Sequence, residues 1–165
     1  MAGLTKDSPL PTEIKLHQHS RRLEIAFSDA ARFTYSFEFL RIMSPSAEVR
    51  GHGPGQETLQ VGKREVDISA LEPVGNYALQ PVFSDGHATG IYSWDYLYHI
   101  GEDEAALWAD YLKRLAAAGA SREAAVALTG VPKAAAAGTP HQAIAVTKDA
   151  APARAFAPLG TKHKL

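Results

Sequence analysis

Alternation of apolar and polar residues with period two, across residues 13–37, constrains this chain more than any other feature. Apolar side chains occupy every second position in three short runs, at 14–16, 23–27 and 33–37, with polar breaks between them. Residues two apart point to the same face of a strand, so each run has one apolar face. Three strands joined by tight turns form an antiparallel meander that buries this face. The chain is therefore predicted to begin as a β-rich domain.

The segment after residue 37 mixes helical and strand patterns. "FEFLRIM" has apolar residues at helical spacing and predicts a short helical turn. "VDISAL" predicts a brief strand, and "YALQPVF" and "GIYSW" predict a hairpin across the turn "SDGHAT". Proline cannot donate a hydrogen bond to a neighbouring strand, so Pro81 is expected at a sheet edge or a bulge.

Residues 102–118 carry the clearest helical pattern. Acidic residues begin this segment, basic residues lie near its end, and Gly119 is placed to terminate it. A shorter helix is expected at about 121–128. Trp108 is expected to be largely buried with Leu112 beside it, because both belong to one apolar stripe. The stripe consists of Leu107, Trp108, Tyr111, Leu112 and Leu115.

The predicted fold class is α+β: a small β-rich domain with an antiparallel meander/hairpin sheet and a C-terminal helix, followed by a disordered tail. Residues 1–10 are expected to be a flexible N-terminus and residues 11–128 to form the domain. Residues 129–165 are rich in Ala and Pro, basic, and poor in large apolar side chains. Such a segment cannot bury enough apolar surface to offset its ordering entropy, so disorder is predicted for it.

Composition excludes several classes of function. The net charge is −1, which gives no overall electrostatic basis for binding nucleic acid or an anionic membrane. The absence of cysteine excludes disulfides, thiolate zinc sites and cysteine-held iron–sulfur clusters. No apolar run has the length of a signal peptide or a membrane span. We therefore expect a cytoplasmic protein without membrane insertion.

The segment "SPSAEVRGHGPG", residues 44–55, predicts a loop that carries several side chains typical of functional sites. A phosphate-binding loop would need a following Lys-Ser or Lys-Thr and an apolar helix, and the sequence has neither. A hydrolase would use Ser44 or Ser46 with His87, but no G-x-S-x-G motif is present. The alternative favoured here is that the two serines cap the end of the short helix, while Pro45 stiffens the loop.

Two histidines in Gly-rich turns raise the possibility of a metal site. His52 and His87, with a carboxylate such as Glu48 or Asp85, offer nitrogen and oxygen ligands suited to iron, manganese or zinc. The loop after the meander and the "SDGH" turn are expected to meet at one end of the sheet, which would bring these histidines together. The simpler alternative is two solvated loop histidines.

Two segments, "LRIMSPSAEVRGHGPGQ" and "KREVDISALEPVGNYALQPVFSDGHATGIYSWDYL", carry a family resemblance. With their separation, they resemble the small bacterial proteins called DUF971, which are similar to the N-terminal domain of gamma-butyrobetaine hydroxylase. The resemblance covers roughly residues 10–118 and implies a compact β-rich α+β domain. A similar domain is appended to Mrp-type P-loop ATPases that handle iron–sulfur clusters. The resemblance therefore also implies an adaptor role near iron or cluster assembly.

The resemblance implies a zinc site that this sequence does not preserve. In the hydroxylase, three cysteines and one histidine hold a structural zinc. The corresponding positions here are Ser44, Ser46, Val49 and His87. Serine hydroxyls are poor zinc ligands and valine is none, so structural zinc is not expected. The iron and 2-oxoglutarate chemistry of the hydroxylase belongs to a separate catalytic domain, and oxygenase activity is not expected of this chain.

The sequence thus predicts a non-catalytic accessory or binding module with a protein partner and no certain cofactor. Its interaction surface is expected on residues 44–55 and 84–90, called the loop face below. The alternative is a metal-binding protein that holds a divalent metal such as iron through His52 and His87. The residues expected on the loop face are Ser44, Ser46, Glu48, Arg50, His52, Asp85 and His87.

Overall fold

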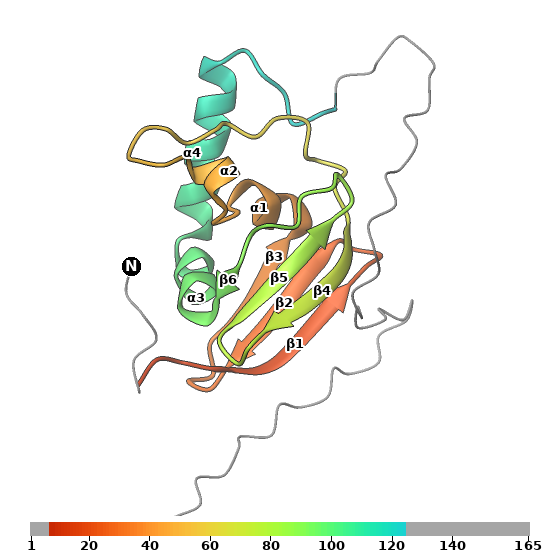
Figure 1. The fold of residues 1–165 in the computed structure, drawn as a ribbon, viewed down its shortest axis with the longest axis vertical. Helices are drawn as coiled ribbons and strands as arrows, with labels where there is room; N and C mark the ends of the chain where they lie inside the picture. Colours follow the sequence, from red (N-terminus) through yellow and green to blue (C-terminus); the bar gives the residue numbers. More distant parts are fainter. Residues whose placement is uncertain (1–6, 125–165) are drawn as a thin grey trace, which may run out of the picture.

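The computed structural model describes residues 7–124 of the chain (Figure 1). The predicted disordered tail, most of the predicted flexible N-terminus and the end of the predicted helix at 121–128 lie outside these residues. Among the described residues, Leu10 already exchanges two hydrogen bonds with Ser28. No helix in this part of the chain is long and apolar enough to cross a membrane.

The predicted meander is confirmed. Strands β1 (Pro11–His17), β2 (Arg22–Phe27) and β3 (Arg32–Ser36) form an antiparallel sheet in the order β1-β2-β3. In β2 the apolar residues Leu23, Ile25 and Phe27 are each at most 2% exposed. Leu23 pairs with Tyr35 across the sheet, which places two buried side chains side by side. The period of two therefore marks the face that packs into the core.

The later strands form a second sheet of their own. Strands β4 (Ile68–Val74), β5 (Ala78–Phe83) and β6 (Tyr92–Ser93) are antiparallel in the order β4-β5-β6. Strand β6 pairs only with Ala78 and Leu79, so beyond Leu79 the strand β5 has β4 as its one sheet neighbour. Pro81 lies in this half-open part of β5, opposite Leu71, as its missing N–H group led us to expect.

Four helices complete the described chain: α1 (Phe37–Ile42), α2 (Ala47–Arg50), α3 (Trp94–Glu102) and α4 (Glu104–Ala117). Helix α1 was predicted, and the hydroxyl of Ser36 caps it by accepting the N–H of Phe39 at 3.1 Å. Helix α4 falls within the predicted 102–118 segment. Helices α2 and α3 were not predicted. Residues 121–124, where a further helix was expected to begin, are not helical; the carbonyl of Ser121 accepts a backbone hydrogen bond from Gly62.

One hydrophobic core joins both sheets and the helices α1, α3 and α4. Figure 1 shows the β4-β5 pair in front of the first sheet, with the helices gathered along one side. Buried residues of the core include Ile25 and Tyr35 of the first sheet, Ile68 of the second and Leu97 of α3. The α+β fold class is thus confirmed, with the predicted strands divided between two sheets that share a core.

The orientation of α4 differs from the prediction. Tyr111 and Leu115 are 3% and 4% exposed, whereas Leu112 is 39% exposed and Trp108 is half-buried. Successive helical residues are separated by about 100°, so a helix that buries Tyr111 turns Leu112 toward solvent. Trp108 still packs against Phe39 and Tyr111 at its inner side.

Candidate functional site

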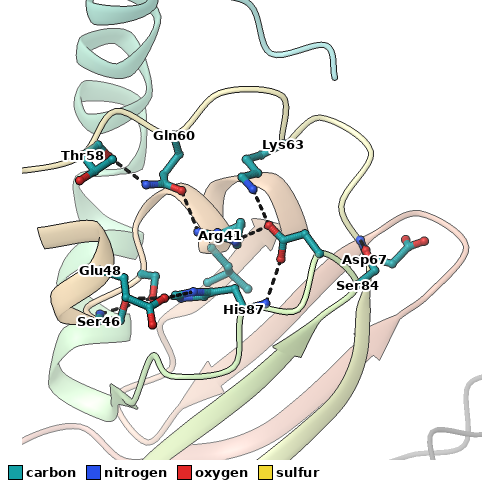
Figure 2. A network of polar contacts seen from close by, with 12 residues as sticks. Arg41, Ser46, Glu48, Thr58, Gln60, Lys63, Asp67, Ser84 and His87 are labelled. Atoms are coloured by element: carbon teal, nitrogen blue, oxygen red, sulfur yellow. Dashed lines mark hydrogen bonds and ion pairs between the residues drawn. The ribbon is translucent and has the colours of Figure 1, made fainter. Parts of the chain in front are cut away.

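The two segments of the loop face meet at the imidazole ring of His87. Its Nε2 atom lies 2.8 Å from Ser44 Oγ and 3.4 Å from Ser46 Oγ. Its Nδ1 atom lies 3.1 Å from Glu48 Oε2 (Figure 2). His87 is 7% exposed and Ser44 is completely buried. Both nitrogens of the ring are therefore engaged, from opposite sides, by residues of the segment that follows α1.

Local geometry explains why these side chains converge. Ser46 is the N-cap residue of α2 but makes no side-chain cap hydrogen bond, because its hydroxyl is directed to His87 instead. Glu48 lies in the first turn of α2, which returns its carboxylate to the other ring nitrogen. The serines were expected to cap the end of α1; that C-cap position belongs to Met43, and both serine hydroxyls contact His87.

A network of charged side chains adjoins the His87 ring, with Arg41 and Lys63 above it in the view of Figure 2. Asp85 Oδ2 accepts hydrogen bonds from Arg41 Nε at 2.9 Å and from Lys63 Nζ at 2.5 Å. Asp85 Oδ1 accepts the backbone N–H of His87 at 3.2 Å. Arg41 Nη1 also donates to Gln60 Oε1 at 3.0 Å. Helix α1, the segment through residues 60–63 and the turn after β5 are thereby connected through one carboxylate.

The electrostatics of this cluster lower the pKa of both titratable groups at its centre. Burial raises the pKa of Asp85, but the hydrogen bond from Lys63 and the charge of Arg41 outweigh it, and the net shift is downward. Burial lowers the pKa of the His87 imidazole and the charge of Arg41 lowers it further, against the opposing effect of Glu48. Asp85 is therefore ionised and His87 neutral at pH 7.

The lowered pKa of His87 makes stability depend on pH. The ordinary pKa of this imidazole is 6.5, and the folded value is lower, so the unfolded chain takes up the proton first as the pH falls. The contribution of His87 is fully present above pH 6.5 and is lost as the pH falls through the lower folded pKa. As the pH falls from 6.5 to the folded pKa of His87, we expect this imidazole to reduce the free energy of unfolding by up to about 1.4 kcal/mol for each pH unit. Urea unfolding between pH 7.5 and 5 measures it, and His87→Gln should show a shallower dependence. Equal slopes would place the titration elsewhere.

Ser44, His87 and Glu48 follow the atomic order of a serine–histidine–acid triad, but their burial is reversed. In such a triad the nucleophile is open to substrate and the acid is buried. Here the Glu48 side chain is 66% exposed and Ser44 is 0% exposed. The backbone of Gly90 packs directly on the hydroxyl, since a Cβ atom at residue 90 would lie 2.4 Å from Ser44 Oγ. This arrangement leaves no room for a carbonyl carbon beside the hydroxyl.

The remaining predicted residues lie outside the cluster around His87. Arg50 donates from Nη2 to the hydroxyl of Tyr96 at 2.6 Å and its guanidinium lies over that ring. His52 is exposed, and its backbone N–H donates to Gln56 Oε1 at 3.3 Å. Within residues 7–124, no group of three or more His, Cys, Asp or Glu side chains is arranged to hold a metal ion. Metal binding through His52 and His87 stays a prediction.

Sequence reasoning missed the residues that anchor the cluster. Arg41 is 7% exposed, and its position as a lone cation in the apolar run "FEFLRIM" was the available signal. Glu38, in the same run, is 5% exposed and receives two hydrogen bonds from Arg122, at 2.8 and 2.5 Å. A charged residue inside a predicted buried helix needs a partner, and each of these has one far along the chain.

A groove of about 310 Å³ lies beside the loop face, between the α1–α2 segment and α4. Apolar side chains of Met43, Val49 and Leu107 contribute to its lining. Arg50 and Asp110 add opposite charges to the same lining. The groove thus combines an apolar surface with charged groups of both signs.

Comparison with known proteins identifies one matching family model. It is described as "Gamma-butyrobetaine hydroxylase-like, N-terminal" and matches residues 14–98. A search of the curated proteins finds no match.

Several solved structures are similar to this chain. One NMR solution structure is 46% identical, with a TM-score of 0.63, and the match covers 79% of this chain and 100% of that chain. Another NMR solution structure is 42% identical, with a TM-score of 0.62, covering 76% of this chain and 98% of that chain. A 1.93 Å crystal structure of a DUF971 family protein of unknown function from Acidithiobacillus ferrooxidans ATCC 23270 is 36% identical. That match covers 55% of this chain and 91% of the other, with a TM-score of 0.47.

Proposed function

Since the chain belongs to the gamma-butyrobetaine hydroxylase-like N-terminal family, we propose that it is a non-catalytic binding module whose loop face contacts a protein partner. The observation that carries this proposal is the network around Asp85 and His87, which fixes two loops against each other. A rigid loop pair loses little conformational entropy when a partner binds. Arg41, Ser44 and His87 of this network are buried. Glu48, Arg50 and His52 of the loop face are exposed.

The groove beside the loop face supports the same proposal. Its apolar lining can receive one side chain of a partner, and its charged residues can orient the segment that carries it. Arg50 belongs both to the groove and to the loop face, so the two form one continuous surface. Docking of a protein segment at this surface requires no change in the described fold.

The absence of catalysis is inferred from the burial of Ser44. If the hydroxyl is inaccessible, replacing Ser44 by Ala should leave the hydrolysis of p-nitrophenyl acetate by the protein unchanged. Imidazoles on the surface supply a background rate, which the Ser44→Ala variant shares. Loss of more than about nine tenths of the rate would identify Ser44 as a nucleophile and refute the non-catalytic part of the proposal.

The binding surface can be tested by quantitative affinity purification from the native host. His52→Glu changes the charge of the loop face at an exposed position that makes no side-chain contact with the His87 cluster. His99→Glu introduces the same change on α3, at a side chain that is 70% exposed, and is the matched control. A partner recovered in stoichiometric amount with wild type and with His99→Glu, but depleted with His52→Glu, supports the proposal. Equal recovery with all three proteins contradicts it.

A further inference from the structure

Three of the four positions that correspond to zinc ligands in the resembled hydroxylase domain are in contact in this fold, and the fourth, Val49, is joined to them through its backbone N–H, which donates to the carbonyl of Ser46 at 3.1 Å. Ser44, Ser46 and His87 are in contact, and Val49 is 6% exposed one helical turn further on. A tetrahedral structural zinc needs four nitrogen or sulfur ligands, typically thiolates and imidazoles. Of the four residues present, only His87 is such a ligand. The donor set therefore does not fit zinc.

The geometry around His87 Nε2 also disagrees with a metal. Two ligand atoms of one tetrahedral zinc lie roughly 3.3–3.8 Å apart, given bonds of about 2.0–2.3 Å. Ser44 Oγ lies 2.8 Å from Nε2, which is the separation of a hydrogen bond. The place where a metal would bridge these two atoms is closed by their direct contact.

A directed chain of hydrogen bonds occupies that place. The carboxylate of Glu48 can only accept, so Nδ1 of His87 carries the proton and Nε2 is the acceptor. Ser44 then donates its hydroxyl proton to Nε2 and accepts the backbone N–H of Ser46 at 3.4 Å. Every side-chain nitrogen and oxygen buried in the described residues has a hydrogen-bond partner. The cluster is thus complete without an added ion.

We infer that this chain has replaced a structural metal by a metal-free pin, in which the imidazole of His87 joins the turn after β5 to the loop after α1. The pin consists of Ser44, Ser46, Glu48 and His87. It connects residues about 40 positions apart along the chain, which is the task of a cross-linking metal ion.

The inference predicts that donors can be restored by substitution. Wild-type protein, purified without a His tag and dialysed against EDTA, should retain less than 0.1 equivalent of zinc by elemental analysis. The triple variant Ser44→Cys, Ser46→Cys, Val49→Cys should retain about one equivalent under milder dialysis and melt at higher temperature with zinc than with EDTA. Adding His87→Ala to the triple variant should weaken zinc binding at least tenfold.

Each outcome decides the inference. One equivalent of zinc in EDTA-treated wild type would show that the present residues bind metal and would overturn it. A folded triple variant that binds no zinc would show that the four positions do not converge, and would also overturn it. If the triple variant is unfolded without metal, cobalt titration is the second measurement: thiolate-to-cobalt and tetrahedral d–d absorption bands that appear with refolding support the inference. Their absence counts against it.

Discussion

Replacing Arg41 by Ala is expected to lower the free energy of unfolding by about 3 kcal/mol. Its side chain is 8% exposed and pairs with Asp85, so its removal breaks a largely buried ion pair, a change that costs roughly 3–5 kcal/mol. The lower end of this range applies because Lys63 still pairs with the carboxylate of Asp85 when Arg41 is removed. The variant also leaves the amide oxygen of Gln60 without this donor. Urea denaturation followed by tryptophan fluorescence measures the change.

A surface arginine with two ion pairs, one more than Arg41, is the control. Arg32 contacts Glu13 and Glu24 on the outer face of the first sheet, but its side chain is 51% exposed. Exposed ion pairs contribute at most about 1 kcal/mol, so Arg32→Ala should be mild. Should the two variants prove equally stable, burial of the Arg41 pair would be unimportant and the network would not organise the loop face.

Strand prediction succeeded where one face of the sheet is buried throughout. In β2, every apolar residue of the alternating run is in the core and every intervening residue is partly or fully exposed. A shift of register by one residue would expose Leu23, Ile25 and Phe27 together, so the pattern permits a single solution. Local sequence is sufficient in such a segment because burial and side-chain period coincide.

Helix α3 was not predicted because the aromatic residues in and before it recur at every second position, which is the period of a β-strand. Tyr92, Trp94, Tyr96 and Tyr98 alternate with period two and favour β structure by propensity. The residues that α3 buries are instead Trp94, Leu97 and Ile100, which are three apart. Tyr96 and Tyr98 reach the backbone of Met43 and the carboxylate of Asp29 through their hydroxyls. Tertiary contacts, which no local window contains, decided between the two periods.

The sequence predicted most residues of the candidate site but not the side-chain contacts that join them. The loop after α1 and the turn after β5 do meet, through Ser44, Ser46 and Glu48, whereas His52 lies outside these contacts. Asp85 was predicted on the loop face, but its partners Arg41 and Lys63 are 44 and 22 residues away. Pairings at such separations depend on the final packing of α1 against the second sheet, which periodicity does not encode.

Replacing Gly90 by Ala is expected to destabilise the protein by about 2–3 kcal/mol, at the upper end for adding a methyl group to a packed core. The new Cβ would lie 2.4 Å from Ser44 Oγ and 2.9 Å from the Tyr92 ring. The ring cannot retreat easily, because Tyr92 is fully buried and donates its hydroxyl to the carbonyl of Leu40. Rotation of the serine would break its hydrogen bond to His87. Chemical denaturation measures the loss.

Two comparisons separate this clash from a general effect of replacing glycine. Gly53, in the loop face, has contacts no closer than 3.9 Å to an added Cβ, so Gly53→Ala should be within about 0.5 kcal/mol of wild type. Ser44→Ala removes the hydroxyl, which is closer to the added Cβ than the Tyr92 ring is. The loss of stability in the double variant Gly90→Ala, Ser44→Ala should therefore be smaller, by at least about 0.5 kcal/mol, than the sum of the losses in the two single variants. Strict additivity would mean that residue 90 does not press on the serine. In that case the Gly90 contact would no longer count against Ser44 as a nucleophile, and the argument would rest on the burial of Ser44 alone.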